Sequence, residues 1–286
     1  MTSALEARGR ARRGLLAAAL AGLLAGALVA PATAVVGGAR ATPRAHAAVV
    51  SLADACTATL VAPDRLLTAG HCASHVDPGV TRVRIGGAAY VAARVARHPR
   101  FRYQLPAYPA QPDHDLAIVE LDRPVPDIAP VALSTRPVRR GERLRLLGYG
   151  TSDPRRPGRF GVLRTARLVV RSATVCRHAI ARADPDQKSQ FHPTRMLCTQ
   201  DPDGRAPYAS GCNGDSGGPL LRWDRERRRS LLVGVDSWGV ACGAQHGDPE
   251  VFVRVAGFRA FVLDPRPAWA SARIRDPWDA AADAAG

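Results

Sequence analysis

Between Val35 and Val262 the chain alternates short apolar runs with glycine, proline and aspartate. Apolar runs of a few residues bounded by turn-forming residues predict short strands rather than long helices. The clearest of these runs lie at 59–61, 116–121, 144–147, 168–170 and 231–235. No long amphipathic period occurs before Phe258–Val262, where we expect the start of a short C-terminal helix. The pattern therefore predicts an all-β domain.

The amino-terminal residues 1–34 break this pattern. A basic segment is followed by an apolar run from Gly14 to Ala30 and then by the small residues Ala32-Thr33-Ala34. That order is typical of a secretory signal peptide with its cleavage site. The apolar run is close to the lower limit of about 17 residues for a membrane span, so an uncleaved anchor is the alternative. We predict a cleaved signal, a secreted, extracellular protein and no stable membrane association.

The carboxy-terminal residues 263–286 form a second departure, because they are rich in Asp, Pro and Ala. We expect an extension that either docks on the body through Trp269 and Trp278 or stays a loose end.

The chain is strongly basic, with 40 Lys and Arg against 25 Asp and Glu and a formal net charge of +15. A basic surface attracts polyanions and acidic substrates. No nucleic-acid-binding motif accompanies the charge, so we expect no nucleic-acid partner. We interpret Arg225–Arg229 as the solvated tip of a hairpin, with an anion-binding exosite as the alternative.

Six cysteines follow the predicted signal peptide. An even number in an exported chain indicates a disulfide framework whose pairing the sequence alone leaves open.

Three segments carry candidate chemistry in the chain order His, Asp, Ser. Ser216 lies in the turn Gly214-Asp215-Ser216-Gly217-Gly218 and needs a base that takes its proton as it attacks. His71 has the intrinsic pKa for that task, and Asp115, before an apolar run, can hold the imidazole and stabilise the imidazolium. The N–H groups of Gly214 and Ser216 would form an oxyanion hole. We predict that His71, Asp115 and Ser216 form a catalytic triad.

The other histidines receive no role. His114 is expected to point away from the partner of Asp115, because adjacent strand residues face opposite sides. The remaining histidines lack metal-ligand spacing, so we predict no metal site and no cofactor. They lie at positions 46, 75, 98, 178, 192 and 246.

The three motifs and their order resemble the trypsin/chymotrypsin family of serine proteases, in its secreted, bacterial-type form. The resemblance spans residues 35–262 and implies an all-β fold of two six-stranded antiparallel β-barrels with a short C-terminal helix. It also implies peptide-bond hydrolysis through an acyl-enzyme, and we expect a monomer acting on proteins or peptides. The disulfides it implies are Cys56–Cys72, Cys176–Cys198 and Cys212–Cys242.

The resemblance also implies an activation step. Family members become active when a new amino terminus pairs with the Asp before the nucleophile, and Val35 and Asp215 match those positions. Because Ala32-Thr33-Ala34 directly precedes Val35, signal cleavage itself would create the active terminus. Cleavage after Ala32 would instead leave an inactive precursor.

The specificity pocket departs from the trypsin pattern. Ser210 stands at the pocket floor, where trypsin-like relatives carry Asp, and Ser237, Trp238 and Gly239 match a wall of the pocket. Glu250 replaces a usual Gly in the opposite wall, where it would either accept a basic side chain or shorten the pocket. We expect cleavage after aromatic or large apolar residues, or a mixed aromatic and basic preference, rather than strict trypsin-like cleavage.

Two other classes compete with a protease. A catalytically inert, basic binding protein on the same fold suits the charge, but such relatives lose the His or the Ser, and this chain keeps both. An esterase of the hydrolase-elbow type needs Gly-x-Ser-x-Gly and the order Ser, Asp, His, which this chain does not have.

Overall fold

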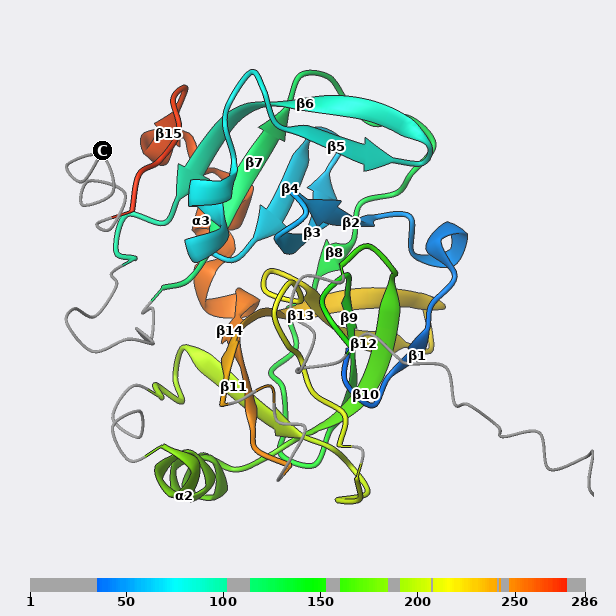
Figure 1. Cartoon of the computed structure of the whole chain (residues 1–286), viewed down its shortest axis with the longest axis vertical. Helices are drawn as coiled ribbons and strands as arrows, with labels where there is room; N and C mark the ends of the chain where they lie inside the picture. Colours follow the sequence, from blue (N-terminus) through cyan, green and yellow to red (C-terminus); the bar gives the residue numbers. More distant parts are fainter. Residues whose placement is uncertain are drawn as a thin grey trace, which may run out of the picture. The chain divides into compact units, whose positions relative to one another are not determined.

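The computed structural model describes residues 35–101, 114–152, 160–184, 191–206, 208–240, 242 and 247–276. Strands dominate this part of the chain, as the alternation of short apolar runs predicts (Figure 1). No helix among these residues is long and apolar enough to cross a membrane. The predicted signal peptide and Trp278 lie outside the described residues.

Six antiparallel strands from the second half of the chain close into a barrel. The order around the barrel is β10 (Arg164–Val170), β11 (Met196–Gln200), β14 (Glu250–Arg254), β13 (Arg229–Gly239), β12 (Pro219–Asp224) and β9 (Arg143–Gly148), which pairs with β10 again. The two-residue strands β1 (Ala39–Arg40) and β8 (Ala132–Leu133) pair with β10 and β13. Leu146, Leu168 and Phe252 are fully buried inside it.

Six strands from the first half of the chain and β15 from its C-terminal end form a seven-stranded sheet. Its order is β15 (Trp269–Ala270), β6 (Ala88–Arg97), β7 (Ala117–Leu121), β4 (Arg65–Thr68), β3 (Cys56–Ala62) and β2 (Val49–Leu52), with β5 (Arg82–Ile85) on β6. The described ladders leave this sheet open between β2 and β5, where the resemblance implies a second closed barrel. Val83 and Ile85 of β5 nevertheless pack into the same core as β2, because alternate β5 residues point inward.

Helices are few in the described residues. The predicted C-terminal helix is present as α3 (Arg259–Leu263). A second helix, α2 (Ala173–Ala183), contradicts our expectation that no helical period precedes Phe258. Its buried face is only Cys176, Ala179 and Ile180, too narrow an apolar stripe to stand out in the sequence. Ser172 caps it by accepting a hydrogen bond from Val175 N–H.

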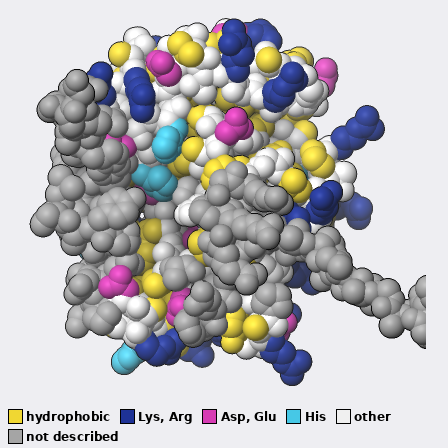
Figure 2. All heavy atoms as spheres, in the orientation of Figure 1, with side chains coloured by type: hydrophobic (Ala, Val, Ile, Leu, Met, Phe, Trp, Pro, Cys, Tyr) yellow, Lys and Arg dark blue, Asp and Glu magenta, His cyan; other side chains and the backbone are white. Residues whose placement is uncertain are grey.

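The arginine-rich segment is a hairpin tip, as predicted. Residues 225–228 form the exposed turn between β12 and β13. Basic side chains are also spread along the edges of the face seen in Figure 2, rather than gathered over one element.

The structure contains three disulfides, and they join the cysteines that the resemblance pairs. They are Cys56–Cys72, Cys176–Cys198 and Cys212–Cys242.

Candidate active site

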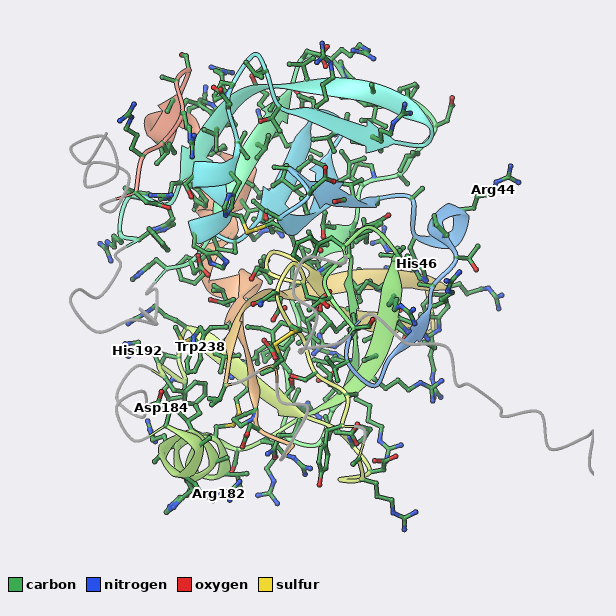
Figure 3. The ribbon with its side chains drawn as sticks, viewed as in Figure 1. Arg44, His46, Arg182, Asp184, His192 and Trp238 are labelled. Atoms are coloured by element: carbon green, nitrogen blue, oxygen red, sulfur yellow. A yellow bond between two sulfur atoms is a disulfide. The ribbon has the colours of Figure 1, made fainter. Side chains whose placement is uncertain are left out.

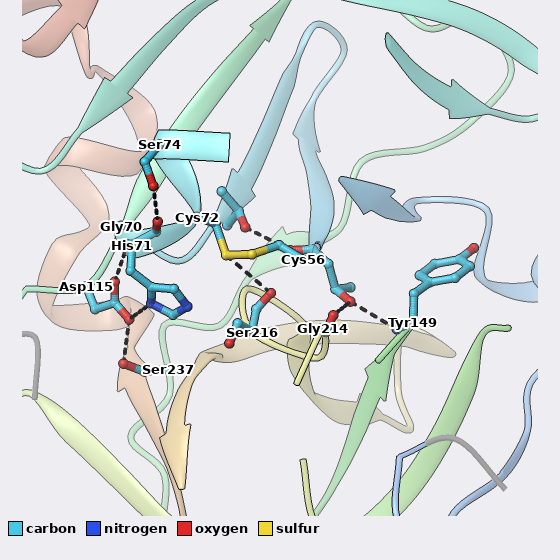
Figure 4. The surroundings of a disulfide bond; sticks show 12 residues. Cys56, Gly70, His71, Cys72, Ser74, Asp115, Tyr149, Gly214, Ser216 and Ser237 are labelled. Atoms are coloured by element: carbon cyan, nitrogen blue, oxygen red, sulfur yellow. Dashed lines mark hydrogen bonds and ion pairs between the residues drawn. A yellow bond between two sulfur atoms is a disulfide. The ribbon is translucent and has the colours of Figure 1, made fainter. Parts of the chain in front are cut away.

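The pairing of β4 with β7 brings His71 and Asp115 together. His71 begins a 3-10 helix, η2 (His71–His75), just after β4, and Asp115 lies just before β7. Thr68 of β4 is the register partner of Ala117 of β7, so the two segments meet at one edge of the sheet. His71 Nδ1 lies 2.9 Å from Asp115 Oδ2, and the His71 backbone N–H donates to Asp115 Oδ1 at 2.8 Å (Figure 4).

Asp115 is completely buried and fully hydrogen-bonded. Ser237 Oγ on β13 donates a third hydrogen bond, of 2.6 Å, to Asp115 Oδ2. A buried carboxylate is tolerated when donors surround it in this way. Since Asp115 accepts from Nδ1, the neutral imidazole carries its proton there and presents Nε2 as an acceptor.

The charges around His71 favour its imidazolium form. Burial lowers the pKa of His71, while the charge and hydrogen bond of Asp115 and the charge of Asp276 raise it, and Arg97 lowers it. The sum raises the pKa of His71 above its ordinary value. The side chain remains 24% exposed, so the ring is still accessible.

Ser216 lies in a turn that packs against the His71 segment. Thr57 N–H donates to Ser216 O at 2.8 Å, and Thr57 Oγ1 donates to Gly214 O at 2.8 Å. Gly214 and Gly217 have φ of 91° and 84°, a region that favours glycine. The same turn lies against the disulfide, because Cys72 Sγ is 3.7 Å from Ser216 O. Figure 4 shows the His71 imidazole between Asp115 and Ser216.

Two N–H groups of this turn have no hydrogen-bond acceptor in the described part of the chain, those of Gly214 and Ser216. Their neighbours are engaged, since Asp215 N–H donates to Cys212 O and Gly217 N–H donates to Asp236 O. The two unengaged donors are the pair predicted for the oxyanion hole.

A ring nitrogen of His71 lies within 4.8 Å of the sulfurs of Cys56 and Cys72. This cluster does not fit a metal ion, because both sulfurs are joined in a disulfide and offer no thiolate.

Asp215 is fully buried beside Ser216. Gly150 and Cys212 donate their N–H groups to its two oxygens at 2.9 and 3.0 Å, and among the described residues no cation pairs with it. Burial raises the pKa of Asp215 to about 8. The carboxylate lies so close to Gly148 that a Cβ there would come within 2.0 Å of Oδ1.

Val35 lies in the same barrel as Asp215. Its side chain is fully buried in the barrel core, and Val36 forms an isolated bridge with Ser210. The φ of Val35 is 46°, a conformation that β-branched residues rarely adopt.

Three of the predicted pocket residues, Ser210, Gly239 and Glu250, meet at the Glu250 carboxylate. Ser210 Oγ donates to Glu250 Oε2 at 2.7 Å, and Glu250 is 4% exposed. A Cβ on Gly239 would lie 2.5 Å from Oε2, so the carboxylate fills the space beside that glycine. Trp238 packs against the cluster around the Cys176–Cys198 disulfide (Figure 3). Ser237, predicted as a wall residue, turns its hydroxyl toward Asp115.

Asp236 is a site residue that the sequence analysis missed. It is 2% exposed, and its carboxyl group lies near Gly211 together with that of Glu250. Burial, followed by the charges of Glu250 and Asp215, raises the pKa of Asp236 well above its ordinary value. An acidic residue directly after the apolar run 231–235 was the available signal, because strand interiors rarely hold an unpaired carboxyl.

His114 points away from the site, but not because of strand alternation. It lies in a turn with φ of 61°. Its ring stacks on His98 at 5.0 Å and meets the edge of Phe258 at 5.3 Å.

The fold combines a closed antiparallel barrel with a second β-sheet, and a buried His–Asp pair lies next to the turn that carries the serine. Together these features define a serine protease with a chymotrypsin-like fold. A family model described as Trypsin matches residues 35–262. The chain belongs to this family and is a serine endopeptidase.

Known proteins agree with that assignment. "Trypsin 5G1" of Aedes aegypti is 32% identical over 222 residues, covering 73% of this chain and 74% of that protein. "Trypsin" of Saccharopolyspora erythraea is 28% identical over 247 residues, covering 80% of this chain and 97% of that protein. The solved structure of neuropsin, described as a serine protease of the mouse brain, shares the fold with a TM-score of 0.63 and 22% identity. That match covers 80% of this chain and 98% of neuropsin.

Proposed function

We propose that this protein is a secreted serine endopeptidase that uses His71, Asp115 and Ser216 as its catalytic triad. The observation that carries the proposal is the orientation of His71 by the buried, three-times hydrogen-bonded Asp115, next to the turn that holds Ser216.

In the proposed mechanism, Ser216 Oγ attacks the carbonyl carbon of the scissile bond while His71 Nε2 takes its proton. Asp115 stabilises the resulting imidazolium, which fits the raised pKa of His71. The carbonyl oxygen becomes an oxyanion that accepts the N–H groups of Gly214 and Ser216. By analogy with measured oxyanion-hole donors, each is worth about 10²- to 10³-fold in kcat.

Collapse of this intermediate breaks the C–N bond, and the imidazolium returns its proton to the leaving amine. The acyl group stays on Ser216 as an ester. Water then attacks the ester with His71 again as base, and the acid product leaves with Ser216 restored.

The proposed activation depends on Asp215. A buried carboxylate without a cation is costly, and an ammonium group at Val35 would supply one. Support comes from the burial of the Val35 side chain in the same barrel and from the unfavourable φ of Val35 in the uncleaved chain. We propose that cleavage after Ala34 frees this amino terminus and orders the turn around Ser216.

The proposed specificity is mixed, for aromatic and basic side chains. Ser210 supplies no charge, but it holds the Glu250 carboxylate in place, and Asp236 adds a second carboxyl behind it. Two neighbouring carboxyl groups share a proton readily, so an uncharged substrate side chain meets a pocket whose negative charge is partly neutralised. A basic substrate side chain would take the place of the shared proton.

The export proposal combines two features. Residues 1–34 have the order of a signal peptide, and three disulfides join all six cysteines. Disulfides persist in oxidising compartments, which favours an extracellular protein.

The proposed function is tested with a fluorogenic peptide library varied at the residue before the scissile bond. The protein should begin at Val35, and Ser216→Ala is the matched control. We expect turnover of peptides with Phe, Tyr, Leu, Lys or Arg at that position, and none with the control. Absence of turnover in the chain whose terminus is verified as Val35 would contradict the proposed endopeptidase activity.

A further inference from the structure

The C-terminal segment (residues 264–276) lies beyond the part of the chain that matches the family model, yet it packs onto the sheet that carries His71 and Asp115. Its strand β15 pairs antiparallel with β6, with Trp269 opposite Ala96. β6 in turn pairs with β7, and Arg97 is the register partner of Ala117, two residues after Asp115. The segment thus becomes an added edge strand next to the candidate site.

Three contacts fasten the C-terminal segment there. The guanidinium of Arg94 lies 4.8 Å from the centre of the Trp269 ring, and Arg273 Nε donates to Ser74 O at 2.9 Å. Ser74 belongs to η2, the 3-10 helix that His71 begins. Ile274 packs against the core of the sheet. The segment is therefore fixed to the helix of the candidate base.

The closest link to the site passes through Arg97. Its Nε donates to Gly70 O at 2.9 Å, and its Nη2 donates to Asp276 Oδ1 at 2.7 Å. The two side chains are only 13% and 3% exposed. Gly70 directly precedes His71, so one end of this guanidinium holds the backbone at His71 and the other end is held by the C-terminal segment.

The charges of this pair act on His71 with opposite signs. Apart from Asp115, the charges that shift the pKa of His71 are those of Asp276, which raises it, and Arg97, which lowers it. A further charged group packed against η2 is Arg273, which donates to the Ser74 carbonyl. The charge of Asp276 therefore offsets the effect of the Arg97 guanidinium on His71, which must become cationic during turnover.

We propose that Asp276 is a positioning residue of the protease site, which holds Arg97 against Gly70 and balances its charge beside His71. The C-terminal segment is then a working part of the enzyme rather than a loose end. This proposal rests on the proposed triad, but the titration of His71 tests it without turnover.

The first test is a pH titration of the His71 imidazole by NMR, in the chain Val35–Gly286 carrying Ser216→Ala. Adding Asp276→Asn removes one of the two negative charges that raise the pKa of His71, so the midpoint should move to lower pH. Adding Asp276→Glu should leave it close to the parent value. Asp264→Asn is the matched control, because Asp264 lies in the same segment and pairs with Arg266 at the surface. It should leave the midpoint unchanged.

The second test uses the active chain. Asp276→Asn should move the acid limb of kcat/KM to lower pH and reduce its maximum, whereas Asp264→Asn should do neither. The double variant Arg97→Leu/Asp276→Leu removes both charges of the ion pair together, so it should fold and still lose kcat/KM through the freed Gly70 carbonyl. Unchanged titration and pH profile with only a lower melting temperature for Asp276→Asn would overturn the proposal. A wild type that neither cleaves peptides nor reacts with a fluorophosphonate would instead reject the proposed function, while the NMR result would still stand.

Discussion

The hydroxyl of Ser210 donates a 2.7 Å hydrogen bond to the carboxylate of Glu250. Ser210, at the floor of the proposed pocket, thus carries no charge itself but holds in place the carboxylate of Glu250 on β14. Asp236, on the neighbouring strand β13, is a second buried acid, and the charge of Glu250 helps to raise its pKa. The acidic character of the proposed pocket therefore resides in its walls.

Replacing Glu250 tests this arrangement. In Glu250→Gln, peptides with Lys or Arg before the scissile bond should lose about 10- to 100-fold in kcat/KM, since a hydrogen bond to a charged group contributes about 1.5–3 kcal/mol. Peptides with Phe should change little, and competition between paired Arg and Phe peptides measures the ratio. An unaltered ratio of Arg to Phe cleavage would show that Glu250 does not determine specificity.

The state of the amino terminus should change how stability depends on pH. In a chain with Thr33-Ala34 ahead of Val35, the pKa of Asp215 is raised from 3.8 to about 8 by burial. The folded state then keeps a proton that the unfolded state releases, so the free energy of unfolding falls as pH rises from about 4 to about 8, by at most about 1.4 kcal/mol per unit.

In a chain that begins at Val35, the ammonium stabilises the ionised carboxylate and this loss should disappear. The charges of Asp236 and Glu250 are coupled to that of Asp215, so the difference between the two denaturation series reports the ionisation of Asp215 together with the response of these two neighbours. Parallel series for the two chains would contradict the proposed pairing.

Ser237 offers a test of how firmly Asp115 must be held. Ser237→Ala removes one of three hydrogen bonds to Asp115 and leaves both donors of His71. We expect kcat/KM to fall by about 10-fold, from the loss of one bond to a charged group. Ser230→Ala on the same strand is the matched control and should keep wild-type kinetics. If both variants behave alike, the Ser237 hydroxyl has no part in orienting the site.

The sequence predicted those features that a local motif carries. His71, Asp115 and Ser216 each lie in a short segment whose flanking residues identify it, and the apolar runs locate the strands. Asp276 and Arg97 could not be paired in this way, because they are 179 residues apart and meet only through the β15–β6 pairing. Strand β15 is only two residues long and both are half-buried, so it leaves almost no periodic pattern.

His114 shows a different limit. The expectation that it points away from Asp115 assumed an extended strand, but its left-handed φ places it in a turn. Packing of its ring on His98 and Phe258 fixes its direction, and such tertiary contacts leave no local signal.

The most direct test of the account is the mass of the chain Val35–Gly286 after treatment with a fluorophosphonate, followed by peptide mapping. The account predicts a single adduct on Ser216, absent from Ser216→Ala and formed far more slowly in His71→Ala. An unmodified Ser216 in a chain verified to begin at Val35 would contradict it and leave a catalytically inert, basic binding protein on the same fold.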